Sequence, residues 1–346
     1  MKKQTAAIFG RSHLKSVVLP VLLFVLLGVV PFLARSHGQS EGGTVLAGRI
    51  GASGVVTSSK NPLQIALLHW YNANLTTQFT VGTSPYGMAF DGANIWVALN
   101  GSGKVTKLRA NDGFNLGSFS VGTNPTGVAF DGANIWVANI NSNNVTKLRA
   151  SNGAVLGTFA VGTQPVGIAF DGTNIWVTNN GSGNVTKLKA SNGAVLGTFP
   201  VGTFPAAVAF DGTNIWVANN GSANVTKMSI NGATLGTFGV GSQPGGVAFD
   251  GTNIWVANFG SNNVTKLATS GTVLGTFPAG SGPSGIVYDG ANIWVTDFNS
   301  TTVTKLLAST GATIGTFTVG SAPVAMGFDG ANIWVSNFKG TTVSKL

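Results

Sequence analysis

The amino-acid sequence predicts an all-β fold: a seven-bladed β-propeller with four antiparallel strands per blade, its ring closed by an N-terminal strand. Three observations lead to this prediction. A unit of about forty residues recurs seven times, and each unit holds four short apolar segments separated by turn residues. The array also ends one segment short, while a matching segment precedes the first unit.

The repeat is clearest in the segment D-G-[AT]-N-I-W-V. Its aspartates are spaced by 40, 40, 40, 39, 39 and 40 residues: Asp91, Asp131, Asp171, Asp211, Asp250, Asp289 and Asp329. Seven of the eight tryptophans occupy one position of this unit: Trp96, Trp136, Trp176, Trp216, Trp255, Trp294 and Trp334. A fixed period of this length indicates a propeller or a solenoid.

The second unit illustrates the strands. Strands are expected at residues 127–130, 135–138, 145–148 and 155–161. Asp131-Gly132 favours a tight hairpin turn between the first two strands, because glycine readily adopts a positive φ. Solenoid coils are usually shorter and seldom contain three hairpin turns, so the propeller is favoured over the solenoid.

The ends of the array predict how the ring closes. The last segment, Val343–Leu346, corresponds to a third strand, and Leu75–Phe79 matches the fourth strand of the second unit. We therefore expect Leu75–Phe79 to pair with Val343–Leu346 and complete the seventh blade. Ile65–Tyr71 also aligns with a third strand; it is expected to pack on the rim or bottom of the propeller, or to displace the C-terminal strand.

The N-terminal region resembles an export signal. Basic residues precede an apolar run from Val17 to Ala34, which is typical of a signal peptide over residues 1–36. The run is also long enough for an uncleaved membrane anchor. Residues 37–63 form a Gly/Ser-rich linker, and residues 64–346 are assigned to the propeller. The protein is expected to be exported to the periplasm, the extracellular space or the cell surface, contacting the membrane through this N-terminal segment alone.

The charge of the chain argues against nucleic acid as a partner. The formal net charge is +9, with 19 Lys+Arg and 10 Asp+Glu. Removal of residues 1–36 takes away five basic residues and no acidic ones. The remainder has 14 Lys+Arg and 10 Asp+Glu, which gives a net charge of +4. Nucleic-acid binding requires a clustered basic face, which this balance does not predict. The propeller is expected to be a monomer.

Residues for catalysis or metal binding are scarce. The chain has no cysteine, and its three histidines and single glutamate (His13, His37, His69 and Glu41) all precede residue 75. The seven repeated aspartates are interpreted as structural turn residues, because Asp-Gly-x-Asn is turn chemistry and calcium requires about 6–8 oxygen ligands. We therefore predict no catalytic residue, no metal site and no cofactor.

The consensus P-x-G-[VI]-A-F-D-G-x-N-I-W-V-[AT]-N, with its V-T-K-L and L-G-T-F-x-V-G strands, resembles the bacterial YVTN-type β-propeller repeat over about residues 65–346. That superfamily is similar to NHL-repeat and virginiamycin B lyase propellers. The resemblance implies a propeller fold and, as one alternative, a streptogramin-lyase-like or lactonase-like enzyme. Such lyases hold magnesium in a pocket of histidine and glutamate, and such lactonases hold calcium with Glu, Asp and Asn. Histidine and glutamate are absent from Leu75 to Leu346, so a non-catalytic binding or structural display module at the cell envelope is expected instead.

Positions at which single repeats depart from the consensus are the candidates for ligand binding. They fall in the turn after the second strand and in the linker before each proline, and both connections emerge on one face of a propeller. The aromatic residues at or beside these positions are Tyr86, Phe204, Phe259, Phe298 and Phe338. They are interpreted either as separate surface aromatics or as one patch for a glycan or an envelope protein.

A lysine follows each repeated tryptophan by eleven residues, as in Trp136 and Lys147. An odd separation across a four-residue loop places two residues opposite each other on one face of a hairpin. Each lysine is therefore predicted to lay its methylene groups over the indole while its ammonium remains in water.

Overall fold

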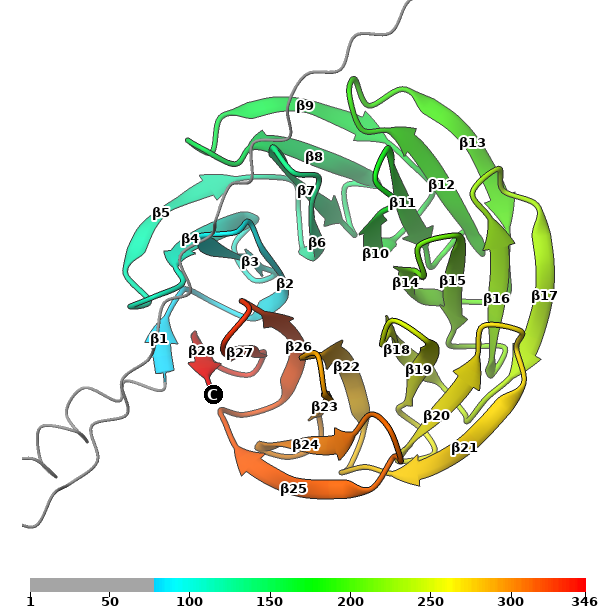
Figure 1. Ribbon diagram of the computed structural model, residues 1–346. Coiled ribbons are helices and arrows are strands. Elements are labelled where there is room, and N and C mark those ends of the chain that lie inside the picture. Colours follow the sequence, from blue (N-terminus) through cyan, green and yellow to red (C-terminus); the bar gives the residue numbers. More distant parts are fainter. Residues whose placement is uncertain (1–77) are drawn as a thin grey trace, which may run out of the picture. The chain divides into compact units, whose positions relative to one another are not determined.

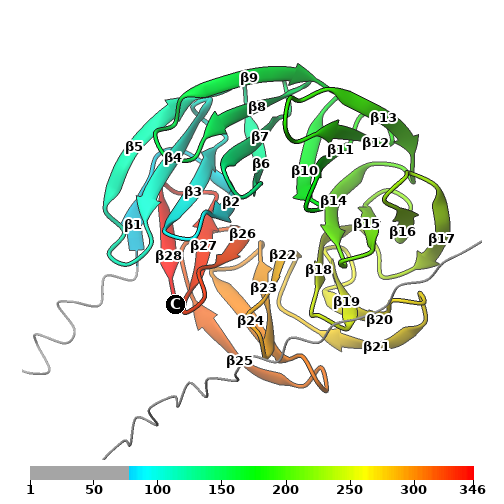
Figure 2. The same cartoon turned by 45° about the horizontal axis from the view of Figure 1, so that its top comes forward.

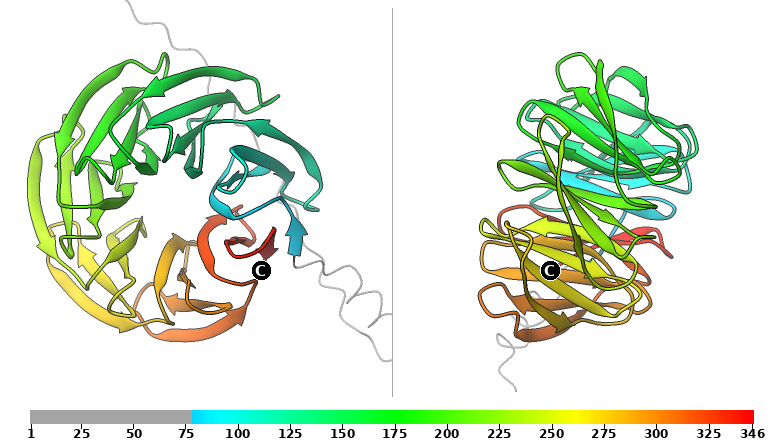
Figure 3. Two further views of the ribbon diagram at one scale, coloured as in Figure 1. Left: turned by 180° about the vertical axis from the view of Figure 1, so that it is seen from behind. Right: turned by 90° about the vertical axis from the view of Figure 1, so that its right-hand side faces the viewer.

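The computed structural model describes residues 78–346, which form seven four-stranded antiparallel sheets arranged as blades around a central channel (Figure 1). The ring is shown tilted in Figure 2, and from behind and from the side in Figure 3. The predicted seven-bladed propeller is confirmed. Within this part of the chain, no helix is long and apolar enough to cross a membrane.

The innermost strand of every blade lines the channel. These strands are β2 (Pro85–Phe90), β6 (Pro125–Phe130), β10 (Pro165–Phe170), β14 (Pro205–Phe210), β18 (Pro244–Phe249), β22 (Pro283–Tyr288) and β26 (Pro323–Phe328). Each begins with proline. Proline has no N–H to donate to a neighbouring strand, and the first position of an edge strand is one of the few strand positions that tolerate this loss. The second strands are β3 (Asn94–Leu99), β7 (Asn134–Asn139), β11 (Asn174–Asn179), β15 (Asn214–Asn219), β19 (Asn253–Asn258), β23 (Asn292–Asp297) and β27 (Ile333–Asn337).

The two outer positions complete each blade. The third strands are β4 (Lys104–Arg109), β8 (Asn144–Arg149), β12 (Asn184–Lys189), β16 (Asn224–Ser229), β20 (Asn263–Ala268), β24 (Thr302–Leu307) and β28 (Thr342–Lys345). The outermost strands are β5 (Asn115–Ser120), β9 (Val155–Ala160), β13 (Val195–Pro200), β17 (Thr234–Gly239), β21 (Val273–Pro278), β25 (Thr313–Thr318) and, in the seventh blade, β1 (Gln78–Thr80).

Antiparallel pairing divides the connections between two faces of the ring. The Asp-Gly turns between first and second strands and the turns between third and fourth strands share one face, which we call the Asp face. The turns between second and third strands share the opposite face with the linkers that lead to the next blade. We call this opposite face the linker face.

The hydrophobic core lies between the blades. Trp96 of the first blade is fully buried and belongs to a cluster with Val128, Ile135 and Leu148 of the second blade. Phe119, on the outer strand of the first blade, lies with its ring centroid 5.4 Å from that of Trp96. The same arrangement recurs around the ring, so each interface between blades is sealed by one Trp–Phe pair.

The ring closes as predicted. β1 pairs with β28 in antiparallel fashion, with Phe79 opposite Val343. Phe79 lies 5.3 Å from Trp334, and Trp334 and Val343 share a buried cluster with residues of the first blade, including Ile95. The seventh interface is therefore built like the other six. The remainder of the predicted closing segment, residues 75–77, and the segment Ile65–Tyr71 lie outside the described residues.

The predicted register of tryptophan and lysine is confirmed, since Trp136 pairs with Lys147 and the other six pairs match. Each lysine Nζ lies 4.6–5.4 Å from the indole centroid. The expectation that the ammonium remains in water is wrong for Lys147, whose side chain is buried. Its Nζ donates to the carbonyl oxygen of Ala190 in the next blade at 2.6 Å.

Five further lysines make the same bond across their interfaces, at 2.6–2.8 Å: Lys107, Lys187, Lys227, Lys266 and Lys345. The Lys345 bond, to Ala110, joins the seventh blade to the first. These bonds, which we call the lysine clasps, connect consecutive blades on the Asp face.

Candidate functional site

The repeated aspartates lie in the turns of the Asp face, where both carboxylate oxygens are engaged. In the second blade Oδ1 of Asp131 accepts hydrogen bonds from the backbone N–H groups of Ala133 and Asn134. Oδ2 accepts a hydrogen bond from the indole Nε1 of Trp136 at 2.8 Å. All seven blades repeat the indole bond at 2.7–2.8 Å. Sequence reasoning missed it, although the constant spacing of five residues between aspartate and tryptophan was its signal.

These hydrogen bonds also govern the acidity of the turn. Partial burial by itself would raise the pKa of the carboxyl, but the bonds from the indole, the asparagine and the backbone amides hold the pKa below its ordinary value. This applies to Asp131, Asp171, Asp250, Asp289 and Asp329. Residues 78–346 contain no group of three or more acidic or histidine side chains placed to hold a metal ion. The engaged carboxylates of the Asp face therefore stabilise turns.

The linker face carries a continuous run of aromatic side chains from four adjacent blades. The ring centroids of Phe259 and Phe298 are 6.0 Å apart, and those of Phe298 and Phe338 are 6.1 Å apart. Phe338 meets Tyr86 edge-on at 5.7 Å, which brings the run into the first blade. We call these four residues the aromatic arc. Offset and edge-to-face contacts of this kind stabilise a fixed arrangement of rings.

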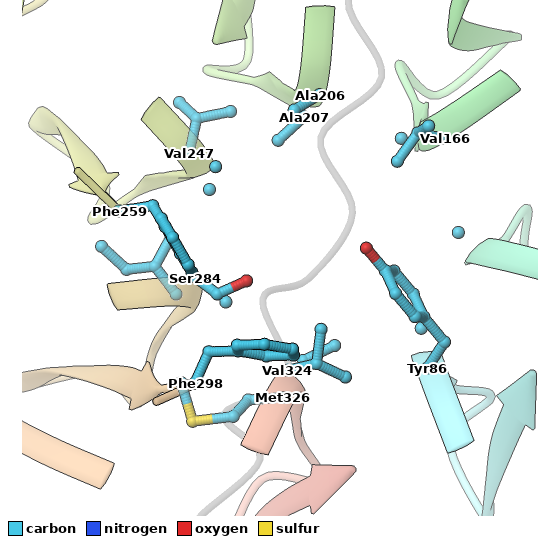
Figure 4. A pocket seen from close by; sticks show the side chains of 18 of the residues that line it. Tyr86, Val166, Ala206, Ala207, Val247, Phe259, Ser284, Phe298, Val324 and Met326 are labelled. Atoms are coloured by element: carbon cyan, nitrogen blue, oxygen red, sulfur yellow. The ribbon is translucent and has the colours of Figure 1, made fainter. Parts of the chain in front are cut away.

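The aromatic arc borders a cavity of about 580 Å³ in the central channel (Figure 4). The wall is formed by the innermost strands, through side chains such as Val166, Val247 and Met326 and through several glycines. None of the residues that line this cavity is charged. A ligand is therefore received by apolar and aromatic surface with a few neutral polar groups, as in many small-molecule sites.

Four neutral polar side chains line the cavity, two with hydroxyl groups and two with amides: Tyr86, Ser284, Asn220 and Gln243. The side chains of Tyr86 and Ser284 both point into the open space (Figure 4). Burial raises the pKa of the Tyr86 hydroxyl, which therefore stays protonated at neutral pH and available as a hydrogen-bond donor. The cavity thus presents a neutral donor opposite an apolar wall.

Phe204, the fifth aromatic candidate, does not join the aromatic arc. It occupies the linker between the third and fourth blades and borders a separate cavity of about 540 Å³ on the linker face. Ile140, Asn141 and Gln164 line the same cavity. The structure therefore unites four of the five aromatic candidates and separates one.

The sixth blade contains a buried carboxylate without a nearby cation. Asp297, at the end of β23, is 0% exposed, and most other blades place asparagine at this position. Its oxygens accept hydrogen bonds from Thr302, Thr304 and the backbone N–H of Gly280 at 2.9–3.0 Å. Burial raises the pKa of Asp297 and outweighs these three bonds. In the seventh blade Asn337 donates to the equivalent hydroxyls, so asparagine fits the same surroundings.

Asp297→Asn is expected to raise the melting temperature at pH 7. Because the native state raises the pKa of Asp297, stability falls as the pH rises from the ordinary value of 3.8 through the raised native value. Asparagine does not ionise and avoids this loss. Thermal unfolding between pH 3 and 8 should show that the melting temperature gained by Asp297→Asn at pH 7 disappears in acid. The same change at an exposed position, Asp112→Asn, should give no gain in melting temperature. A gain that is equal at every pH contradicts the role assigned to ionisation.

The fold has clear counterparts among solved structures. Streptogramin B lyase superposes with a TM-score of 0.68 at 18% identity, over 78% of this chain and 95% of the lyase. The structures similar to this chain include virginiamycin B lyase-like propellers. Virginiamycin B lyase from Staphylococcus aureus gives a TM-score of 0.68 at 16% identity, over 78% and 97% of the two chains. Hydrazine synthase from Kuenenia stuttgartiensis gives a TM-score of 0.70 at 20% identity, over 77% of this chain and 96% of the hydrazine synthase chain.

No protein-family model and no curated protein sequence matches the chain. The likeness to the solved structures therefore shows the propeller fold alone. The magnesium pocket implied by the lyase resemblance does not fit residues 78–346. Residues 78–346 contain neither histidine nor glutamate, and the side chains that line the channel cavity carry no charge.

Proposed function

We propose that this chain is an exported β-propeller that acts as a non-catalytic binding module at the cell envelope. The observation that carries the proposal is the aromatic arc at the uncharged cavity of the channel. A turn requires no aromatic side chain, and the corresponding turns of the other blades hold asparagine or isoleucine. Aromatic residues gathered on one surface are typical of binding sites. The ligand is a glycan or an envelope protein.

Changing Phe259, Phe298 and Phe338 together to serine should leave the fold intact and abolish binding. The three side chains belong to turns, which accept polar residues, and they supply most of the aromatic surface. Pull-downs from envelope extracts and a panel of glycans measure binding, and circular dichroism measures folding.

The matched control changes three exposed side chains of the outer strands, Leu156, Leu196 and Leu274, to serine. This control removes three apolar side chains away from the aromatic arc and should leave binding unchanged. A triple phenylalanine variant that binds as the parent does would place the ligand elsewhere.

Export rests on residues 1–36, and its test is separate. Cell fractionation with N-terminal sequencing of the exported protein distinguishes a cleaved signal peptide from a retained anchor. Recovery of the protein in the cytoplasm contradicts export without affecting the binding site.

The alternative is a streptogramin-lyase-like or lactonase-like enzyme, and its support is the likeness of fold. General acid–base chemistry requires a group with a pKa suited to proton transfer at the reacting atom. Among residues 78–346, Tyr86 is the one titratable side chain that lines the channel cavity, and burial raises its pKa. Incubation of the purified protein with a streptogramin and magnesium, or with a lactone and calcium, tests this alternative by product formation.

A further inference from the structure

Phe204 has an unusual backbone conformation. Every linker contains a residue with positive φ immediately before its proline, and in the sixth blade this residue is Gly282, with φ of 66°. Phe204 takes the same left-handed conformation, with φ of 50°. This region is unfavourable for a bulky side chain, and glycine enters it at little cost. The linker imposes this conformation in every blade, so the feature that points to a function is a bulky aromatic side chain at a position where the other linkers have smaller or polar residues.

The Phe204 side chain gains little from packing. It is 56% exposed, so burial does not offset the strain of its backbone. Its ring lies over Gly221, where an added Cβ would lie 2.6 Å from Cδ2 of the ring. The preceding residue, Asn220, lines the channel cavity beside the aromatic arc. The ring of Phe204 therefore lies beside Gly221, next in sequence to a residue that lines that cavity.

The cavity bordered by Phe204 is rich in amides. Asn141, Asn143 and Gln164 line it together with the hydroxyl of Thr163, and none of its lining residues is charged. Internal hydrogen bonds orient these side chains: Asn141 donates to Asn124 at 2.7 Å, and Asn143 accepts from the backbone N–H of Gln164 at 2.9 Å. An amide has two donor hydrogens and an oxygen with two lone pairs, so each of these side chains retains capacity for a ligand.

We propose that this cavity, with Phe204 as its platform, is a second subsite of the binding module and that the ligand is a neutral oligosaccharide. The inference rests on the proposed binding function and specifies its ligand. A sugar ring has an apolar face of C–H groups, which stacks on an aromatic ring, and an edge of hydroxyls, which pairs with planar amides. The two cavities offer these two kinds of group and no charge. An acidic saccharide would lose hydration of its carboxylates with no cation in the lining to compensate.

An extended peptide is less suited to this surface. Peptides commonly bind by adding a strand to a free sheet edge. The outermost strands have free edges at the rim of the ring and the innermost strands have free edges along the channel, whereas Phe204 lies in a linker, which is not part of a sheet edge. The oligosaccharide is therefore the occupant that the surface favours.

The test measures binding of neutral hexasaccharides by calorimetry, with cellohexaose, maltohexaose and the N-acetylglucosamine hexamer as probes. Hexagalacturonate and a capped hexapeptide of glycine, serine and tyrosine serve as the charged and peptide probes. Phe204→Gly should weaken binding of the neutral hexasaccharide about tenfold or more. It should not lower the melting temperature, because glycine suits the backbone conformation.

Two further variants separate the role of the ring from that of the linker. Ala322→Gly makes the equivalent change in the linker of the seventh blade, at φ of 52°, and should leave binding unchanged. Phe204→Trp restores an aromatic platform and should retain binding.

Three results overturn the proposal: no neutral hexasaccharide binds the parent at millimolar concentration, the charged or peptide probe binds more tightly, or Phe204→Gly binds as the parent does. If Phe204→Gly binds normally while the triple phenylalanine variant does not, the second subsite fails and the proposed binding site remains. If both variants bind as the parent does, both proposals fail.

Discussion

Deleting residues 72–80 should lower the melting temperature of the propeller far more than deleting residues 37–60. The first deletion removes β1, the outer strand of the seventh blade, and leaves an edge of β28 unpaired. It also removes the ring of Phe79 from Trp334. Phe79 is half-buried, so loss of its ring costs part of the about 3–5 kcal/mol that a fully buried phenylalanine contributes, and loss of the strand adds to it. Thermal unfolding followed by circular dichroism measures the difference.

A pair of point variants tests whether closure uses the same contacts as the other interfaces. Phe119 occupies the position of Phe79 in the first blade and lies 5.4 Å from Trp96, against 5.3 Å for Phe79 and Trp334. Phe79→Ala and Phe119→Ala should therefore destabilise the protein to a similar extent. Equal melting temperatures for the two deletions, or a harmless Phe79→Ala, would contradict the closed ring.

The fold could be predicted because the same turn and strand signals recur in seven units of the sequence. The Asp-Gly turn and the spacing of eleven residues between Trp136 and Lys147 define hairpins, whose register depends on nearby residues alone. The absent fourth strand at the C-terminus and its match near Phe79 then predict closure. Each of these features is readable within one unit or by comparing units.

Contacts between blades could be predicted less well. The clasp of Lys147 ends on a carbonyl oxygen 43 residues further along, and a backbone carbonyl leaves no mark in the sequence. The aromatic arc could be predicted as one possible arrangement, because Phe259, Phe298 and Phe338 share one position in consecutive units. The separation of Phe204 from the arc could not be predicted, because it depends on the direction in which each linker presents its side chain.

Lys147→Glu should destabilise the propeller strongly, and this expectation replaces the modest effect that an ammonium in water would predict. Lys147 is 6% exposed, and its Nζ donates to the carbonyl oxygens of Ala190 and Ser191 at 2.6 and 3.3 Å. Glutamate would direct a carboxylate at these two oxygens, leave both without their donor and bury an unpaired charge. A buried, uncompensated charge costs about 3–5 kcal/mol.

Two comparisons identify the source of this effect. Arg149→Glu makes the same change of charge two residues along β8, at an exposed side chain, and should alter the free energy of unfolding by about 0.5 kcal/mol or less. Lys147→Met keeps an unbranched side chain over Trp136 and removes the donor, so it should cost about 1–3 kcal/mol. Chemical denaturation measures all three variants. If Lys147→Glu is no worse than Arg149→Glu, the clasp contributes nothing to stability. The expected order, with glutamate at 147 most damaging and methionine intermediate, assigns the stabilisation to the bond between ammonium and carbonyl, beyond the packing of the side chain on the indole.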